Sequence, residues 1–359
     1  MPIDTFAPIT SADSPPAAQG FQMPTEWAEH QCTWLSWPHN TETWPNGRLR
    51  PVEDALATAV RALATGEAVR INVLDETHEA HVRDRIGTPD TAYPILYHHI
   101  PTNDAWCRDH GATFVARESQ GPSLAAIDWT YNAWGDKYPP YDRDAKVARR
   151  MAEVLEVPCF ATDLVAEGGA LEIGEDGLLL TTSSCLLNEN RNPDWSRREV
   201  EATLRKLLGA REVHWLPGAD LVGDDTDGHV DNLVRFGPEN TIFVATEDDP
   251  ADANFSSLNR LREQVEHIAA NRGCTVVPLP LPDPVIVDGT RLPASYANFY
   301  IGNEVVLLPC FDDPADASAC DALRDVFSGR EVIGIDATAI AWGLGTLHCL
   351  TQQVPAVAT

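Results

Sequence analysis

The chain has 359 residues, 43% of them hydrophobic, which is enough for one large domain or two ordinary ones around a sizeable core. Acidic residues outnumber basic ones 54 to 26, and the formal net charge is -28. Nucleic acids and anionic membranes both require a basic surface, so this charge argues against either as a partner. The negative charge could attract a cationic substrate. It could equally serve only to keep the protein in solution.

The cysteines and the N-terminal residues indicate a cytoplasmic protein. Eight cysteines are scattered without a CxxC pair or the Cys/His spacing of a zinc finger. The first twenty residues lack the basic start and apolar run of a signal peptide, and no apolar stretch is long enough for a membrane helix. We therefore expect free thiols in a reducing cytoplasm, with residues 1–20 as a flexible tail and residues 21–359 as a single catalytic domain.

The predicted elements begin with an apolar and aromatic strand over residues 32–38. A helix over residues 51–65 follows, because Pro51 fits its first turn and apolar residues recur along one face. Residues 68–74 then predict a second strand.

From residue 106 onward a pattern recurs: a short polar motif, a strand, a tight turn, a second strand, a helix and a further strand. The helices of four such units are predicted over residues 143–155, 196–208, 256–271 and 315–327. Ser196 and Glu199 have the spacing of a capping box, and Gly273 closes the third of these helices. A fifth unit begins with a strand that carries Cys349 and is completed in space by the N-terminal segment.

The polar motifs occupy the same place in each unit, where the chain enters a hairpin. They carry, at similar intervals, Asp109, Glu167, His229, Asn298 and Cys349. Units arranged around an axis would bring all five motifs to one central site. We therefore predict a five-fold pseudosymmetric α/β propeller, a single domain with its helices outside. A doubly wound parallel sheet fits less well, because the units contain antiparallel hairpins and no GxGxxG follows the first strand.

Together with Asp231, these motifs combine a thiol, an imidazole and three carboxylates. A thiol beside a histidine is the minimal nucleophile–base pair. In an amide hydrolase one polar residue orients the histidine, and further acids would only discourage ionisation of the thiol. Three carboxylates make sense if the substrate brings the positive charge. A guanidinium is planar, always protonated and matched to carboxylates in bidentate fashion.

Simpler interpretations exist for several of these residues. Asp109 also fits a structural ion pair with Arg108, and residues 167–169 fit a plain turn. Residues 224–231 alternate acids with a histidine at ligand-like spacing, but no second histidine completes a metal set, so we predict neither a metal nor another cofactor. Trp106 is either ordinary packing or a wall on which a cation rests.

Short motifs run in order through the chain, from about residue 21 to 355. They are 23–27 (MPTEW), 34–38 (WLSWP), 104–109 (DAWCRD), 167–169 (EGG), 188–193 (NENRNP), 226–232 (TDGHVDN), 295–299 (SYANF), 311–316 (FDDPAD) and 348–353 (HCLTQQ). In these motifs the chain resembles the agmatine deiminase family. That family belongs to the guanidine-modifying (pentein) superfamily, which also holds arginine deiminases, peptidylarginine deiminases and amidinotransferases. The family fold is the five-fold α/β propeller.

The resemblance implies a cofactor-independent hydrolase that converts agmatine and water to N-carbamoylputrescine and ammonia, a step of putrescine biosynthesis in polyamine metabolism. Cys349 would attack the guanidinium carbon and form a covalent thiouronium intermediate. His229 would act in turn as general acid and general base, and Glu167 would orient it. Asp109 and Asp231 would grip the guanidinium nitrogens. The weaker candidates for lining the pocket are Trp106 and Asn298.

The chain departs from the family pattern beside the nucleophile. Residues 343–349 read GLGTLHC where the family usually has GGGNIHC, and residues 110–112 read HGA where the family commonly has TGP. These changes leave the nucleophile and the acids intact, so guanidine chemistry is expected, and they lie where the substrate's tail would be recognised. Peptidyl-arginine or free arginine stays open as the substrate. A Cys–His amidohydrolase and a non-catalytic guanidine-binding protein are weaker alternatives, and a homo-oligomer stays open.

Overall fold

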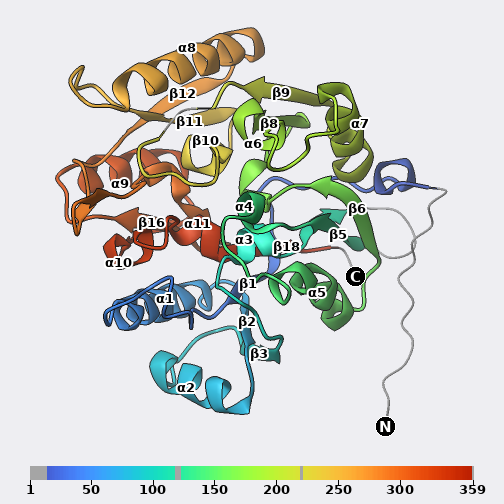
Figure 1. Cartoon of the computed structure of the whole chain (residues 1–359), viewed down its shortest axis with the longest axis vertical. Helices are drawn as coiled ribbons and strands as arrows, with labels where there is room; N and C mark the ends of the chain where they lie inside the picture. Colours follow the sequence, from blue (N-terminus) through green and yellow to red (C-terminus); the bar gives the residue numbers. More distant parts are fainter. Residues whose placement is uncertain (1–13, 118–122, 219–220, 358–359) are drawn as a thin grey trace.

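The structure is a computed structural model in which residues 14–117, 123–218 and 221–357 are described. Within these residues, five sheets of three or four strands surround a common centre, and the longer helices lie toward the outside (Figure 1). A separate hairpin is formed by β13 (Ile286–Val287) and β14 (Thr290–Arg291). This arrangement confirms the predicted α/β class, with small sheets inside and helices outside.

Four of the sheets share one topology. Their first two strands form an antiparallel hairpin, and the third strand pairs in parallel with the second. The strands are β4 (Thr113–Ala116), β5 (Leu124–Thr130) and β6 (Cys159–Val165); β7 (Glu172–Ile173), β8 (Leu178–Thr182) and β9 (Glu212–Leu216); β10 (Val234–Gly237), β11 (Thr241–Thr246) and β12 (Thr275–Pro280); β15 (Tyr300–Ile301), β16 (Val305–Cys310) and β17 (Glu331–Asp336). The crossovers that these parallel pairs require run through α5 (Val147–Leu155), α7 (Arg197–Leu208), α8 (Phe255–Arg272) and α9 (Ala315–Val326).

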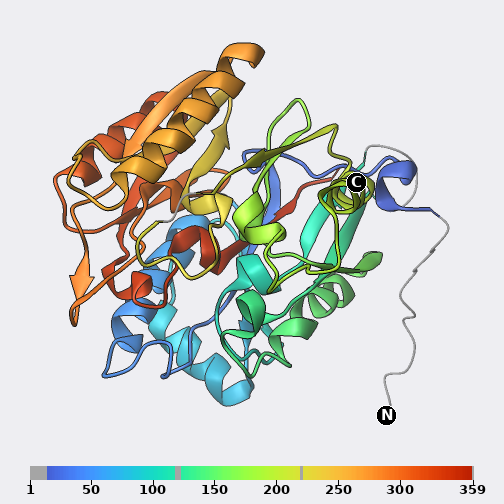
Figure 2. The ribbon, with the colours of Figure 1, turned by 45° about the horizontal axis from the view of Figure 1, so that its top comes forward.

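The fifth sheet joins segments from opposite ends of the chain. β18 (Thr351–Pro355) is antiparallel to β1 (His30–Ser36), and β1 is parallel to β2 (Ala68–Val73) through the crossover helix α1 (Leu49–Leu63). Figure 2 shows the blue N-terminal strand beside the red C-terminal strand. The predicted completion of the last unit by the N-terminal segment is therefore confirmed.

Two elements of this sheet unit are absent from the sequence prediction. They are α2 (Glu76–Ile86) and β3 (Ile95–His99), and β3 extends the sheet alongside β2. In α2 only Val82 and Ile86 are buried, so the helix lacks the apolar stripe by which α1 is recognised. Its start is instead fixed by Asp75, whose carboxylate accepts a hydrogen bond from the backbone N–H of His78.

Five short helical turns meet at the centre of the molecule. They are α3 (Cys107–His110), η3 (Gly168–Ala170), η4 (Val230–Asn232), η5 (Tyr296–Asn298) and α11 (Leu347–Leu350). Each turn contacts the next one along the chain, and α11 contacts α3, so the ring is closed. Each turn also directly precedes the first strand of its unit. The polar motifs therefore do occupy equivalent positions around one axis, as the repeat predicts.

The prediction that Cys349 lies on a strand is wrong. Cys349 lies within the turn α11, and β18 starts only at Thr351. The hydroxyl of Thr351 donates to the carbonyl of Leu347 (2.9 Å), which closes the turn before the chain extends. The apolar residues around Cys349 are buried on all sides, so a short buried turn and a buried strand give the same sequence pattern.

The tail predicted for residues 1–20 is corrected at its C-terminal end. Residues 1–13 lie outside the described residues, but η1 (Pro16–Gln19) is a short helical turn that packs against α7. Pro16 occupies its first position, where the missing N–H costs nothing. The backbone of Gln22 then pairs with Ala116, which attaches this segment to the edge of the β4 sheet.

The remaining short elements lie in the connections between these units. They are η2 (Asp144–Lys146), α4 (Ala133–Asp136), α6 (Ser183–Leu186) and α10 (Thr338–Ala341). None of the described helices is both long and apolar enough to cross a membrane.

Neighbouring units are joined by shared cores and by buried ion pairs. Phe243 on β11 packs against Phe299, with ring centroids 5.3 Å apart, and so links the third unit to the fourth. Arg235 on β10 is fully buried, and its guanidinium lies 2.8 Å from Glu26 and 3.0 Å from Glu172. Buried charges need such partners, so Arg235 fixes the N-terminal segment against two other units.

We expect Ser196→Ala to lower the free energy of unfolding by about 1 kcal/mol, the usual value of an N-cap. Ser196 caps α7 in the predicted capping box, in which its hydroxyl and backbone N–H exchange hydrogen bonds with Glu199. Ser196→Asp retains an acceptor and is the matched control. Urea unfolding followed by circular dichroism measures both variants. Equal midpoints for the Ala and Asp variants would contradict a contribution from this cap.

Candidate active site

A cavity of about 680 Å³ opens at the centre of the ring, and both Asp109 and Cys349 line it. Its aromatic walls come from Trp106, Tyr131, Trp134, Tyr138 and Trp342. The other predicted site residues do not line the cavity but are fully buried beside it: Glu167, His229, Asp231 and Asn298. The prediction that Asn298 lines the pocket is therefore wrong, whereas Trp106 does form part of the wall.

Cys349 is positioned by the turn α11 and is only 3% exposed. Its Sγ lies 3.7 Å from Oδ2 of Asp231 and 3.2 Å from the amide nitrogen of Asn298. Burial, together with the charges of Asp231 and Asp109, raises the pKa of the Cys349 thiol well above its usual value. Without a cation in the cavity, Cys349 is therefore a protonated thiol near neutral pH.

His229 lies between two carboxylates. Its Nδ1 is 3.8 Å from Oδ1 of Asp109, and its Nε2 is 3.6 Å from Oε2 of Glu167. Burial disfavours the imidazolium, but Asp109, Cys185 and Glu167 together outweigh it, and the pKa of His229 is raised well above its usual value. Neither ring nitrogen has a hydrogen-bond partner among the described residues. A protonated His229 is thus available to deliver a proton to a ligand.

Asp109 comes from the turn α3, and two neutral donors fix its carboxylate. Oδ1 accepts from the backbone N–H of Gly169 and Oδ2 from the indole N–H of Trp134, each at 3.0 Å. Burial raises the pKa of Asp109 to about 6, and the charge of His229 opposes that rise. A carboxylate with a pKa raised in this way gains most from a cationic ligand, because the ligand replaces the missing counter-charge.

Asp231 has one oxygen paired and one unpaired. Oδ2 accepts from Nδ1 of His348 (2.7 Å), and the other nitrogen of His348 lies 2.7 Å from Glu26. Oδ1 has no hydrogen-bond partner among the described residues. Burial alone would raise the pKa of Asp231, but His348 outweighs it and the pKa is lowered. Asp231 is therefore an ionised carboxylate with one oxygen available to a donor.

His348 and Glu26 are site residues that the sequence analysis does not single out. Both lie in quoted motifs, 23–27 and 348–353, but neither shows the spacing of a nucleophile–base pair. Burial raises the pKa of Glu26, yet Arg235 and His348 hold it well below its usual value. Only the three-dimensional structure shows that the His348 side chain bridges the carboxylates of Glu26 and Asp231.

Arg108 does not pair with Asp109, so the simple ion-pair interpretation of that motif is wrong. The guanidinium of Arg108 donates to Oε1 of Gln353 (2.7 Å) and lies 3.6 Å from Glu26. Arg108 thus binds residues on the side of the ring away from Asp109, which keeps Asp109 available to face the cavity.

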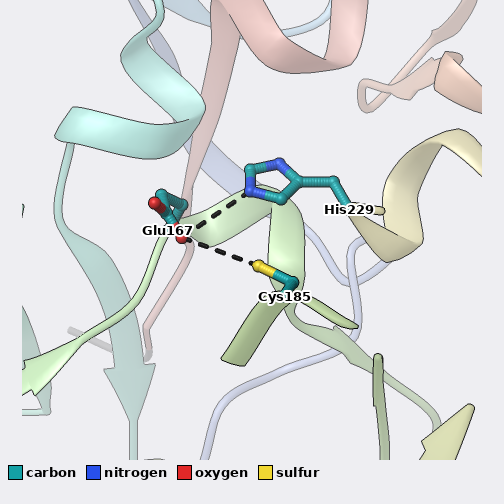
Figure 3. A group of neighbouring side chains, drawn as sticks. All are labelled: Glu167, Cys185 and His229. Atoms are coloured by element: carbon teal, nitrogen blue, oxygen red, sulfur yellow. Dashed lines mark hydrogen bonds and ion pairs between the residues drawn. The ribbon is translucent and has the colours of Figure 1, made fainter. Parts of the chain in front are cut away.

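Glu167 forms a compact group with Cys185 and His229 (Figure 3). Ligand-type atoms of the three side chains lie within 4.8 Å of one another, a spacing that a metal ion could bridge. The guanidinium of Arg191, however, lies 2.7 Å from Oε1 of Glu167 and is itself buried. A fixed cation on the carboxylate repels a metal ion, so we interpret the group as a support for His229 rather than as a metal centre.

The acidic loop of residues 224–231 is likewise occupied by protein donors. Asp224 accepts from Thr226 and from the backbone N–H of Gly228. Asp227 lies within 3.0 Å of Lys137 and 2.7 Å of Arg191. Neutral donors therefore hold Asp224 and cations hold Asp227, so the loop does not present a set of open ligands.

Comparisons with known proteins agree with this geometry. Residues 22–355 match the model of the family described as Porphyromonas-type peptidyl-arginine deiminase. An agmatine deiminase from Pseudomonas fluorescens is 36% identical, with 97% of this chain and 99% of that protein covered. The solved structure of an agmatine deiminase of Enterococcus faecalis has a TM-score of 0.86 at 28% identity, covering 96% of this chain and 98% of the other.

A second solved structure, an agmatine deiminase of C. jejuni with substrate bound, has a TM-score of 0.85 at 27% identity and covers 94% of this chain and 97% of the other. Cavity, thiol and paired carboxylates together define a hydrolase that acts on a guanidine carbon–nitrogen bond. The chain belongs to the Porphyromonas-type peptidyl-arginine deiminase family.

We expect Gly169→Ala to reduce turnover by about a hundredfold, since misplacing catalytic groups by about 1 Å has effects of that size. A Cβ at residue 169 would lie 2.6 Å from Nδ1 of His229 and 2.9 Å from both Asp109 and Asp231. Gly329→Ala, whose Cβ meets no atom within 4 Å, is the matched control. Steady-state kinetics of both variants, with melting temperatures, test this. Equal activity of the two would show that the packing at Gly169 is tolerant.

We also expect the pH at which Cys349 becomes reactive to fall when a neighbouring negative charge is removed. The charge of Asp109 helps to raise the pKa of the Cys349 thiol. Asp109→Asn therefore favours the thiolate and moves the midpoint of alkylation to lower pH. Mass spectrometry of the peptide that carries Cys349, after timed iodoacetamide treatment, gives the midpoint. An upward shift in this variant would contradict the proposed electrostatics.

Proposed function

We propose that this protein hydrolyses agmatine to N-carbamoylputrescine and ammonia. The observation that carries the proposal is the pair of buried carboxylates, Asp109 and Asp231, beside the buried thiol of Cys349. Such a group of acids is stable only when cations face it, and a guanidinium supplies both the charge and the matching N–H donors. The likeness to agmatine deiminases over nearly the whole chain supports the same reaction.

Binding comes first in the proposed reaction. The guanidinium donates to the unpaired Oδ1 of Asp231 and to the carboxylate of Asp109, and its plane is held over Sγ of Cys349. Its positive charge opposes the two carboxylates that raise the pKa of the Cys349 thiol. The thiol therefore ionises when substrate is bound, releasing its proton to water, and the nucleophile is formed only where it is needed.

The thiolate then attacks the guanidinium carbon, and a neutral tetrahedral adduct forms. Protonated His229 transfers its proton to one amino group, which leaves as ammonia, and a thiouronium joined to Cys349 remains. Neutral His229 next takes a proton from a water molecule that attacks the same carbon. Collapse of the second adduct expels the thiolate and releases the ureido product, while its hydroxyl proton passes to water. Glu167, fixed by Arg191, keeps His229 in place through both steps.

The cavity wall favours an amine tail over a carboxylate tail. The acids that line it, besides Asp109, are Glu42, Asp104, Asp144 and Asp225. No lysine or arginine is among the described residues of this lining. Burial raises the pKa of Asp144 to about 7, so a cation bound nearby would favour its ionised form. The α-carboxylate of free arginine would meet like charge here, whereas the ammonium of agmatine would be attracted.

We further propose a cytoplasmic location. All eight cysteines lie in the described part of the chain and are free thiols. A reducing compartment preserves them, and Cys349 in particular has to stay reduced to act as a nucleophile.

Ammonia release by the purified protein tests the function, with agmatine, free arginine and a blocked arginine peptide compared side by side. We expect turnover of agmatine, at least tenfold lower kcat/KM for the other two, and no turnover of any by Cys349→Ser. Preferential turnover of arginine or the peptide would support the proposed reaction but show that agmatine is not the substrate. Absence of ammonia from all three would overturn the proposed function.

A further inference from the structure

We propose that Asn298, fixed by Thr346, is a further catalytic residue whose side-chain amide donates a hydrogen bond to Sγ of Cys349 and stabilises the thiolate. The proposal rests on the proposed function, in which Cys349 is the nucleophile. It gives Asn298 a role on the reacting sulfur atom in place of the pocket-lining role that its sequence position predicts.

The orientation of the Asn298 amide is fixed by the donors around its oxygen. Oδ1 accepts from the hydroxyl of Thr346 (2.6 Å) and from the backbone N–H groups of His348 (3.1 Å) and Cys349 (3.4 Å), and Sγ of Cys349 lies 3.5 Å from it. An amide flipped by 180° would direct its NH₂ group at the hydroxyl and the two backbone N–H groups and lose these three hydrogen bonds. The oxygen therefore faces the backbone of the turn α11, and the NH₂ group faces Asn232 and the sulfur atom of Cys349.

The NH₂ group of Asn298 points at the nucleophile. Nδ2 lies 3.2 Å from Sγ of Cys349 and 3.0 Å from Oδ1 of Asn232, so each of its two hydrogens has an acceptor. Asn298 is fully buried, and Cys349 is nearly so. A hydrogen bond to an ionised acceptor in such surroundings is stronger than one to a neutral acceptor, so this contact favours the thiolate over the thiol.

A neutral donor is the only kind that suits this position. The thiolate of Cys349 forms beside Asp231 and Asp109, both of which oppose its charge. A lysine or arginine beside the sulfur would stabilise the thiolate but would also repel the guanidinium that the two acids attract. The amide of Asn298 stabilises the anion with no net charge, so binding of the cationic substrate is unaffected.

Thr346 is a positioning residue, because it acts through Asn298. Its side chain is buried, and its hydroxyl makes the shortest of the three hydrogen bonds to Oδ1. It lies in the segment of residues 343–349 where this chain departs from the family pattern, and the threonine hydroxyl provides the donor that holds the amide. At this position of the altered segment, Asn298 therefore has a hydrogen-bond donor on its oxygen.

The test measures the pH midpoint of Cys349 alkylation by iodoacetamide, together with the pH profile of kcat/KM. We expect Asn298→Ala to raise the midpoint by about one to two pH units, the range for loss of a hydrogen bond to a charged group. Thr346→Val is expected to shift the midpoint in the same direction by less, and Thr346→Ser, which keeps the hydroxyl, is expected to restore the wild-type value.

Asn192→Ala is the matched control for general loosening of the fold. Asn192 is a buried asparagine that donates to the carbonyls of Val165 and Leu186, in a different unit from Cys349. We expect this variant to alkylate with the wild-type midpoint.

An unchanged midpoint in folded Asn298→Ala overturns the proposal, and so does an equal shift in the Asn192→Ala control. If Asn298→Ala does not fold, Thr346→Val decides, since valine replaces the hydroxyl with a methyl group and keeps the branched shape of the side chain. Alkylation requires no substrate, so a shifted midpoint in a protein that does not turn over agmatine supports the role of Asn298 while the proposed function fails.

Discussion

The centre of this molecule depends on a balance between buried acids and the cations that face them. Glu26, Glu172 and Asp231 are buried within reach of Arg235 or His348, and Glu167 is paired with Arg191. The Glu167–Arg191 pair lies within the second unit, but the pairs of Arg235 and of His348 join different units of the ring, so charge pairing connects the units as apolar packing does. Asp109 and the free oxygen of Asp231 are the part of the balance left for a ligand. The same group of buried charges therefore stabilises the fold and provides the binding site.

The sequence predicted the repeat and the central site because each unit carries its own signals. These signals are local: the cap at Ser196, the glycine at 273 and the polar motif before each hairpin. The closed ring follows from the repetition of such units. The sequence did not predict α2, because this largely polar helix lacks an apolar stripe along one face. The turn at Cys349 was also beyond it, because a fully buried turn and a buried strand have the same apolar pattern.

The roles of individual site residues were harder to predict than their presence. Asn298 lies in the expected motif, but only the hydrogen bonds of its amide show that the NH₂ group faces the sulfur atom of Cys349 and not the cavity. His348 adjoins the nucleophile in the sequence, yet it bonds to Asp231 and Glu26 from other units. Such contacts depend on how the units are rotated around the ring, and no single segment of sequence encodes that rotation.

The pairing of β1 with β18 has a consequence for the order in which the protein is made. A ribosome synthesises β1 among the first described elements and β18 as the last of them, so the fifth sheet can close only after the other four sheets have been made. Cys349 lies directly before β18 and therefore joins the ring after the turns of the other four units. A nascent chain carries the acids of the site long before it carries the nucleophile.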